Sequence, residues 1–476
     1  MNLTDEITLL TENLHWLTKD QAWHYRVLPK LKSDKVFLLY CEDTADQNTL
    51  VAELEILLNR TIELEPVTVS QIAKLLSKYY IKDNAAQGAS QFQINNADNF
   101  LMNLISEAKG LKSSDIHIES YENKCRVRIR IDGMMVERYL LKRDEYPALI
   151  NKIKIFANLD IAEKRLPQDG RINFKQQGQQ FDIRVSVLPA LYGEKVVLRL
   201  LNSDATEIDL NSLGFSDFDL ENYLQGIKKP NGILLISGPT GSGKTTTLYG
   251  TLKFLNKETR NILTIEDPVE YTLEGINQVQ LKESIGLTFS AALRTFLRQD
   301  PDVIMVGEIR DTETANMAIR AALTGHLVLS TIHTNSAWGT VSRLIDMGVP
   351  PFLVANTLNT TVAQRLVRLL CPNCKKEELF NNGLYPKQFK PFREVSHHFK
   401  TQGCEHCHYT GYKGRKAVYE VIPIDQELVF EIKNGNMYIQ NLLKERGIQT
   451  LAENAFNLFS SGLTTIDEIY PLLFNY

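Results

Sequence analysis

The chain has 476 residues, of which 43% are hydrophobic and 23% charged, and its formal net charge is −4. Because single hydrophobic cores usually stop growing at roughly 250–300 residues, we expect several domains rather than one. A weakly acidic chain gives no reason to expect a surface that coats nucleic acid. No apolar run approaches the ~20 residues that cross a bilayer, and no signal-peptide core is found, so we expect a cytoplasmic protein, at most peripheral to a membrane.

Residues 1–85 predict a small α/β domain. Helical periodicity covers Leu50–Leu58 and Val69–Tyr80, and Val36–Tyr40 is a short strand-like run. The stretch Lys82–Ser90 is small and polar, which is typical of a flexible linker. The sequence therefore predicts a domain boundary in this stretch.

Residues 97–202 predict a second domain, in which a helix precedes several strands. Apolar and charged residues alternate in Cys125–Ile131, Phe181–Val187 and Lys195–Leu200. Such alternation predicts half-buried strands with a charged outer face. A second polar segment, 202–211, separates this domain from the next.

The run Gly238-Pro-Thr-Gly-Ser-Gly-Lys-Thr245 follows the apolar segment Ile233–Ile236 and leads into helix-favouring residues. Glycines let backbone N–H groups surround phosphate oxygens, a lysine reaches the β/γ oxygens, and a hydroxyl binds Mg²⁺. The sequence therefore predicts a phosphate-binding loop with ATP and Mg²⁺ as ligands. Its expected contact residues are Gly238, Pro239, Thr240, Gly241, Ser242, Gly243, Lys244, Thr245 and Thr246.

Four apolar segments between residues 212 and 370 each end in a group with a possible function. They lead into the phosphate loop, Glu266, Glu308 and His333. Parallel sheets bind ligands beyond the carboxyl ends of their strands, so we expect these groups to converge in one nucleotide-binding domain. Glu308 has the position of a Mg²⁺-side carboxylate, and Thr245 is the other expected magnesium ligand; a surface glutamate is the alternative.

Hydrolysis also needs a group that activates water and cations that stabilise the phosphoryl group. The acidic run Thr264-Ile-Glu-Asp-Pro-Val-Glu270 offers three carboxylates, and their spacing does not choose among them. Two histidines could contact the γ-phosphate or be structural, and four arginines could stabilise charge or form surface ion pairs. These candidates are His326, His333, Arg184, Arg199, Arg294 and Arg298.

Two Cys-x-x-Cys pairs follow the nucleotide-binding domain, within the predicted lobe 371–418. They consist of Cys371, Cys374, Cys404 and Cys407. Four thiolates in two pairs predict a tetrahedral structural Zn²⁺ site, which has no open position for water and no catalytic role. A redox dithiol and an iron–sulfur cluster are the alternatives. Residues 419–476 predict a C-terminal helical region.

From about residue 97 onward, the chain resembles the hexameric ATPases that power type II secretion and type IV pilus assembly. Besides the phosphate loop, the acidic run and the cysteine pairs, the shared motifs are Ser113-Ser-Asp-Ile-His-Ile-Glu119, Arg128-Ile-Arg-Ile-Asp-Gly133, Leu166-Pro-Gln-Asp-Gly-Arg171, Leu293–Asp311, Thr324-Gly-His326 and Thr410-Gly-Tyr-Lys-Gly-Arg415. The resemblance implies an α/β multidomain protein with a PAS-like middle domain over 97–202 and a RecA-like P-loop core over 212–370.

The resemblance also implies roles for single residues. Glu270 is the expected general base, with Glu266 as the second choice, and His333 lies beside the γ-phosphate. Arg184 and Arg199 are expected to reach the site across a subunit interface. Arg294 and Arg298 are expected to support it from within the core.

The resemblance finally implies a cytoplasmic homo-hexamer that couples ATP hydrolysis to pseudopilus or pilus assembly and to protein export. The amino-terminal domain is expected to bind cytoplasmic domains of inner-membrane platform proteins, which places the motor peripherally at that membrane. The short amino-terminal part favours type II secretion over pilus extension. A RecA-like nucleic-acid translocase and an ATP-binding scaffold without activity are the alternatives, and no nucleic-acid partner is expected.

Overall fold

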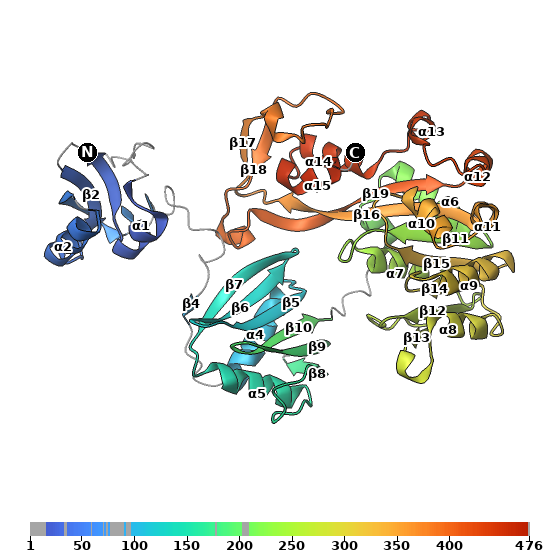
Figure 1. Ribbon diagram of the computed structural model, residues 1–476, viewed down its shortest axis with the longest axis horizontal. Coiled ribbons are helices and arrows are strands. Elements are labelled where there is room, and N and C mark those ends of the chain that lie inside the picture. The colour runs from blue at the N-terminus through green and yellow to red at the C-terminus, as the bar shows by residue number, and fades with distance from the viewer. Residues whose placement is uncertain are drawn as a thin grey trace. The chain divides into compact units, whose positions relative to one another are not determined.

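The computed structural model describes residues 16–32, 36–58, 60–69, 71–72, 75–76, 90–91, 97–176, 179–201 and 209–474. These ranges contain helices and four sheets, which confirms a mixed α/β fold (Figure 1). No helix within them is long and apolar enough to cross a membrane. The expected linkers fall mainly on residues 82–89 and 202–208, which lie outside the described ranges, as do residues 70, 73–74 and 77–80 of the expected helix 69–80.

The amino-terminal part contains a three-stranded sheet. Its strand β2 pairs antiparallel with β1 and parallel with β3. Leu28, Leu39 and Leu54 are fully buried in its core. Its elements are α1 (Lys19–Tyr25), β1 (Leu28–Lys32), β2 (Val36–Glu42), α2 (Gln47–Leu58) and β3 (Thr61–Val67).

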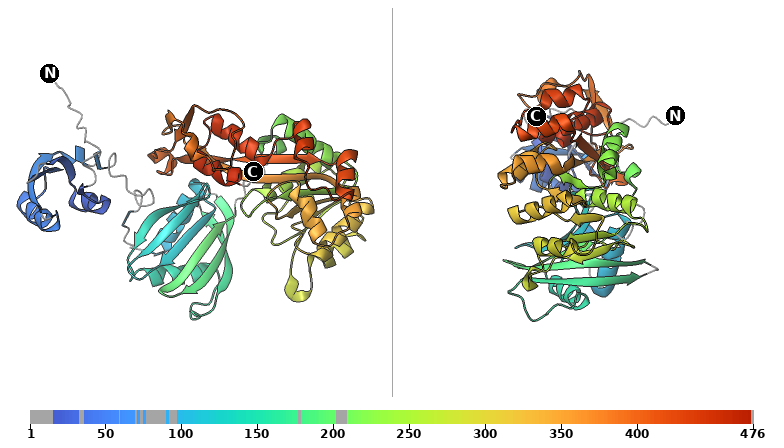
Figure 2. Two further views of the ribbon diagram at one scale, coloured as in Figure 1. Left: turned by 45° about the horizontal axis from the view of Figure 1, so that its top comes forward. Right: turned by 90° about the vertical axis from the view of Figure 1, so that its right-hand side faces the viewer.

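A seven-stranded sheet, called the middle sheet here, has the strand order β4-β7-β6-β5-β10-β9-β8, and Figure 2 shows its strands side by side. The predicted alternation is present, because every second residue of Cys125–Ile131 is buried. Its elements are β4 (Ser90–Gln91), α4 (Ala97–Gly110), β5 (Asp115–Ser120), β6 (Cys125–Ile131), β7 (Met134–Leu141), α5 (Tyr146–Phe156), β8 (Gln168–Gln176), β9 (Gln179–Ala190) and β10 (Gly193–Leu200).

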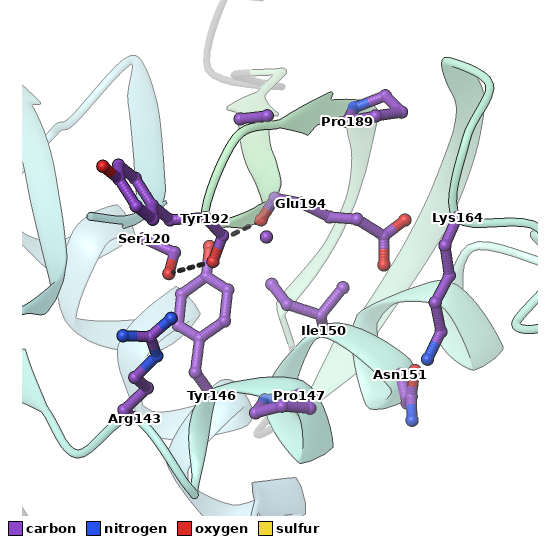
Figure 3. A pocket seen from close by; sticks show the side chains of 12 residues that line it. Ser120, Arg143, Tyr146, Pro147, Ile150, Asn151, Lys164, Pro189, Tyr192 and Glu194 are labelled. Carbon is purple, nitrogen blue, oxygen red and sulfur yellow. Dashed lines mark hydrogen bonds between the residues drawn. The ribbon is translucent and has the colours of Figure 1, made fainter. Parts of the chain in front are cut away.

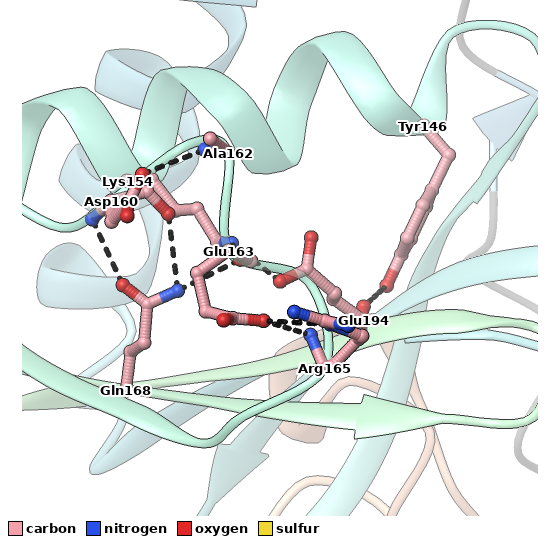
Figure 4. A network of polar contacts seen from close by, with 8 residues as sticks. All are labelled: Tyr146, Lys154, Asp160, Ala162, Glu163, Arg165, Gln168 and Glu194. Carbon is pink, nitrogen blue, oxygen red and sulfur yellow. Dashed lines mark hydrogen bonds and ion pairs between the residues drawn. The ribbon is translucent and has the colours of Figure 1, made fainter.

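A buried lysine fixes the loop between α5 and β8 (Figure 4). Lys154 has no exposed side-chain surface, and its Nζ donates to Glu163 O at 2.7 Å and pairs with Glu194 Oε1 at 2.5 Å. Gln168 closes the same loop, because its Nε2 donates to the carbonyl oxygens of Asp160 and Glu163. A buried charge needs such partners, so this network stabilises the loop that leads into β8 and the motif Leu166–Arg171.

The second seven-stranded sheet, called the core sheet here, has the order β13-β12-β14-β15-β11-β16-β19. Its strands are parallel except for β19, which is antiparallel to β16. Its elements as far as β16 are η3 (Leu210–Ser212), α6 (Asp217–Lys228), β11 (Gly232–Ser237), α7 (Lys244–Leu255), β12 (Ile262–Glu266), β13 (Asn277–Gln280), η4 (Glu283–Ile285), α8 (Phe289–Phe296), β14 (Val303–Val306), α9 (Thr312–Leu323), β15 (Leu327–Ile332), α10 (Gly339–Asp346), α11 (Pro351–Thr357) and β16 (Leu358–Leu370).

Apolar clusters cover both faces of the core sheet. Along β11, Ile233 and Leu235 belong to one cluster, and Leu234 and Ile236 belong to the other. Adjacent strand residues point to opposite faces, so a parallel strand covered on both sides must be apolar throughout. This is why the segment before the phosphate loop shows no alternation.

The cysteine pairs lie in the long connection between β16 and β19. These two strands pair from Thr360↔Pro423 to Leu370↔Tyr412, so the core sheet extends beyond residue 370. Buried residues of the C-terminal helices, such as Phe456 and Ile469, belong to the same cluster as Ile233 and Leu235 of β11. The remaining elements are β17 (Lys376–Leu379), η5 (Asn382–Leu384), β18 (His397–Lys400), η6 (Glu405–Cys407), β19 (Tyr412–Pro423), α12 (Gln426–Lys433), α13 (Gln440–Glu445), α14 (Leu451–Ser460) and α15 (Ile466–Phe474).

Candidate active site

The predicted phosphate loop connects the buried strand β11 to α7. Its glycines Gly238, Gly241 and Gly243 all have positive φ angles, of 151°, 81° and 90°. Residues with a Cβ rarely adopt such angles, which accounts for glycine at these three positions. The loop therefore has a backbone conformation that its glycines specify.

The loop and the first turn of α7 fit an anionic ligand. The N-cap residue of α7 is Gly243, which has no side chain to accept from the first backbone N–H groups of the helix. Ser242 Oγ is buried without a hydrogen-bond partner. Lys244 Nζ donates to the carbonyl oxygens of Gly238 and Pro239 at 2.7 and 3.1 Å, and burial lowers the pKa of this amine. These donors match the oxygens of a phosphate group.

The four predicted strands β11, β12, β14 and β15 are adjacent and parallel, so their carboxyl ends lie at one edge of the core sheet. Glu308 follows β14, and its side chain is 15% exposed. His333 follows β15, and its Nε2 lies 3.5 Å from Glu308 Oε2. The structure thus brings two of the predicted residues into contact at the edge where the phosphate loop begins.

Arg310 is a further member of this group that the sequence analysis missed. Its guanidinium pairs with Glu308, and this hydrogen bond raises the pKa of Arg310. Its second nitrogen lies 3.9 Å from Asp267 Oδ2, so it connects the strand ends of β14 and β12. The sequence offered one signal for it, because Arg310 lies two residues after Glu308 within the shared motif Leu293–Asp311.

The acidic run separates into a buried carboxylate and a half-exposed one. Glu266 is 3% exposed and accepts hydrogen bonds from Tyr249 Oη, Thr264 Oγ1 and Gln278 Nε2. The side chain of Glu270 is 39% exposed, and its Oε2 lies 3.1 Å from Arg184 Nη1. Glu266 is buried and bonded to protein donors, whereas water can reach the carboxylate of Glu270, so this geometry favours Glu270 over Glu266 as a general base.

Arg184 and Arg199 are neighbours in the middle sheet, because they are directly paired between β9 and β10. Arg199 pairs with Asp115 at 3.0 Å. Arg184 contacts Glu270 of its own chain, so this contact does not require a neighbouring subunit. Arg171 is paired with Arg184 from β8, which makes a row of three arginines that only the strand register reveals.

The other two predicted arginines lie on or just after α8. Arg294 pairs with Glu313, and both side chains are more than half exposed. Arg298 Nη1 donates to the carbonyl oxygen of Arg294 at 2.8 Å. His326 Nδ1 lies 2.9 Å from Ala321 O and 3.2 Å from Thr324 Oγ1, which is a structural role at the end of α9.

Arg365 of β16 is a second cation beside the phosphate loop, and no sequence motif indicated it. A Cβ on Gly238 would lie 3.1 Å from Arg365 Nη1, so the guanidinium is adjacent to the loop backbone. Its Nη1 donates to Gln364 O at 3.0 Å, and its Nη2 lies 3.4 Å from Asn335 Oδ1. Burial lowers the pKa of this arginine, which is one reason that an anion beside it would be favourable.

The four cysteine sulfurs form one cluster, with all their atoms within 4.8 Å of one another. Three Sγ–Sγ distances are 3.7 to 3.8 Å. Four sulfurs at about 2.3 Å from a tetrahedral zinc ion are about 3.8 Å apart, so the donor set and its geometry fit zinc. The backbone N–H groups of Cys404 and Gly411 donate to Cys407 Sγ at 3.2 Å, as expected around a thiolate.

A cavity of about 240 Å³ lies within the middle sheet region and not at the phosphate loop (Figure 3). Its lining includes Ser120, Tyr146 and Tyr192. Tyr146 Oη donates to Glu194 O at 2.6 Å, and Ser120 Oγ donates to Tyr192 O at 2.8 Å. These hydroxyl groups are already bonded to backbone, so they hold the β9–β10 hairpin in place.

Known proteins resemble this chain over most of its length. Residues 92–471 match the family described as Type II/IV secretion system protein. The type IV pilus assembly ATPase PilB of Myxococcus xanthus is 48% identical over 382 residues, covering 78% of this chain and 66% of the relative. The type II secretion system protein E of Dickeya dadantii is 46% identical over 368 residues, covering 77% of this chain and 73% of the relative.

The solved structure of the ATPase DotB of Legionella pneumophila shares the fold. It is 21% identical, covers 82% of this chain and 99% of its own, and has a TM-score of 0.61. The family match confirms the resemblance that the motifs indicated, and the names of the relatives agree with the phosphate loop and the strand-end carboxylates. The chain belongs to the family of type II/IV secretion system proteins and is a secretion or pilus-assembly ATPase.

Proposed function

We propose that this chain is a homo-hexameric motor that hydrolyses ATP to drive pseudopilus assembly and protein export in a type II secretion system. The main support is the convergence of the phosphate loop, Glu308 and His333 at one edge of the core sheet. We assign a RecA-like core to residues 212–370, a PAS-like domain to 97–202, a zinc lobe to 371–418 and a helical region to 419–476, with β19 completing the sheet of the RecA-like core.

In this proposal each strand end has one task. Lys244 and the N–H groups of α7 bind the phosphates, and Glu270 takes the proton of the attacking water. Thr245 and Glu308 are the oxygen ligands suited to Mg²⁺, which when bound screens the charge of the phosphates. His333 lies beside the terminal phosphate. Arg184 and Arg199 stabilise charge that develops there, supported by Arg294 and Arg298.

A Glu270→Gln variant tests the catalytic assignment. Because general base catalysis contributes about 10²–10⁴-fold, we expect kcat for ATP hydrolysis to fall by at least about 10²-fold while ADP still binds. The kcat of Glu266→Gln is measured beside it, because Glu266 is the second choice for the general base. Full turnover by Glu270→Gln would refute the assignment.

Hexamer formation is tested by sedimentation of the full chain with a non-hydrolysable ATP analogue. We expect a particle of six chains and a turnover per chain that rises with protein concentration. A monomer with the same turnover at every concentration would refute the ring motor.

Pilus extension is the second candidate, because the pilus assembly ATPase of Myxococcus xanthus is as similar to this chain as the secretion protein. We propose that residues 1–85 bind the cytoplasmic part of an inner-membrane platform protein and place the motor at that membrane. Affinity capture with the full chain, and with a chain lacking residues 1–85, tests this proposal. Identification of a secretion or a pilus platform protein decides between the two machines, and capture without residues 1–85 would refute the recruiting role.

A further inference from the structure

We propose that Tyr249 is a positioning residue that couples the phosphate-binding helix α7 to the loop that contains Glu270. This inference rests on the proposed role of Glu270 as general base. Tyr249 lies on the second turn of α7, five residues after Lys244. Its ring is fully buried and contacts the Tyr271 ring edge to face, with centroids 4.5 Å apart.

The Tyr249 hydroxyl has a complete set of hydrogen bonds. It donates to Glu266 Oε2, and it accepts from Glu270 N at 3.3 Å and from Gln278 Nε2 at 3.4 Å. A phenol offers one proton and two lone pairs, so all its bonding capacity is used. Burial, followed by the nearby Glu266, raises the pKa of Tyr249, which keeps the hydroxyl protonated as a donor.

Glu266 determines which way this hydroxyl points. Its second oxygen accepts from Thr264 Oγ1 at 2.6 Å and Gln278 Nε2 at 3.1 Å. Since the Tyr249 proton points at Glu266, the hydroxyl lone pairs face the N–H donors of the acidic loop. The buried carboxylate therefore acts through Tyr249, and has no need to contact the reacting atoms.

The loop after Glu266 has further bonds to the same group. Gln278 Nε2 donates to Tyr271 O at 3.2 Å, and Leu273 N donates to Gln278 Oε1 at 2.6 Å. The bond from Glu270 N to Tyr249 Oη connects this loop to α7 at the residue whose side chain is the proposed base. Any shift of α7 caused by phosphate binding at Lys244 is therefore passed to the backbone of Glu270.

The test variant is Tyr249→Phe in the full chain. Because small misplacements of catalytic groups can cost up to about 10²-fold, we expect kcat for ATP hydrolysis to fall at least about tenfold. The Kd for ADP measured by calorimetry should stay within about twofold, because the phosphate loop itself is unchanged.

Tyr223→Phe is the matched control. Tyr223 of α6 is also fully buried, and its hydroxyl forms a hydrogen bond with Thr251 Oγ1 of α7 at 2.6 Å, away from the acidic loop. A purely structural role predicts that both variants lower the melting temperature and kcat alike, and that outcome would overturn the proposal. If Tyr249→Phe does not fold, Gln278→Met is measured instead, and an unchanged kcat in that variant would overturn the proposal too.

The double variant Tyr249→Phe with Glu270→Gln separates this inference from the proposed function. If Tyr249 acts through Glu270, the double variant turns over as slowly as Glu270→Gln alone. Multiplied losses would show that Tyr249 acts elsewhere and would overturn the coupling. If Glu270→Gln alone keeps full turnover, the general-base assignment fails and this inference fails with it. If Glu270→Gln loses turnover while Tyr249→Phe keeps it in full, the general-base assignment stands and only the coupling through Tyr249 fails.

Discussion

Replacing Gly238 by alanine should damage the phosphate loop for two separable reasons. A Cβ at this position would lie 2.6 Å from both Gln364 O and Ser242 Oγ, and the residue has a φ of +151°. Overpacking costs about 1–3 kcal/mol. A side chain in a sparsely populated backbone conformation costs about 1–3 kcal/mol more. We therefore expect Gly238→Ala to lower the free energy of opening of β11 by about 2–6 kcal/mol.

Gly241→Ala is the matched control in the same loop. Gly241 has a φ of +81°, and nothing lies within 4 Å of its added Cβ, so only the backbone cost applies. That cost is about 1–2 kcal/mol. Native-state hydrogen exchange of the β11 amides, read by mass spectrometry, gives both free energies locally. Equal losses for the two variants, or no loss for Gly238→Ala, would refute the steric argument.

Three further outcomes are expected. Metal analysis should find about one zinc ion per chain, and Cys371→Ser should lower solubility while the Kd for ADP stays unchanged; unchanged solubility without zinc would contradict a structural role. Arg368→Met should lower the free energy of unfolding by about 1.5–3 kcal/mol in urea titrations, because Arg368 bonds Glu468 through Nε at 2.8 Å. The exposed pair of Arg294 is the control, and Arg294→Met should cost only about 0–1 kcal/mol. Burial raises the pKa of Glu420 above its ordinary value of 4.5, so this carboxyl group binds its proton more tightly in the folded state. Its contribution to stability is present below pH 4.5 and is lost as pH rises through the folded pKa. In paired urea titrations from pH 4.5 upward, the free energy of unfolding of the wild type should therefore fall relative to that of Glu420→Gln.

The parts of the site that lie on single strands could be predicted from the sequence. An apolar run followed by a polar residue gives the strand end directly, as with Val303–Val306 and Glu308. Cysteine spacing likewise predicts a cluster, because short knuckles bring each pair together. The roles of the three acidic-run carboxylates could not be separated in this way. Glu266 is enclosed by Tyr249 and Gln278, which are 17 and 12 positions away, and no local pattern indicates that enclosure.

Strand pairing determined two further features that the sequence did not predict, the arginine row and the position of Arg365. Arg171, Arg184 and Arg199 form a row only because β8, β9 and β10 pair at those residues, and a shift by one position would turn Arg171 to the opposite face. Arg365 reaches the phosphate loop because β16 is the neighbour of β11 in the core sheet. Such adjacency depends on tertiary packing, which composition and periodicity do not encode.

The zinc lobe should be structurally independent of the nucleotide site because of its position in the chain. Its cysteines lie in the connection 371–411 between β16 and β19, whose two ends are joined by the bond from Cys371 N to Gly411 O at 2.9 Å. The strands on either side remain paired over many residues of the core sheet, with apolar clusters on both faces. Since this pairing does not pass through the cysteines, loss of zinc should unfold the connection while β11, β16 and the phosphate loop keep their register. Solubility and nucleotide affinity should therefore respond separately when a cysteine is replaced.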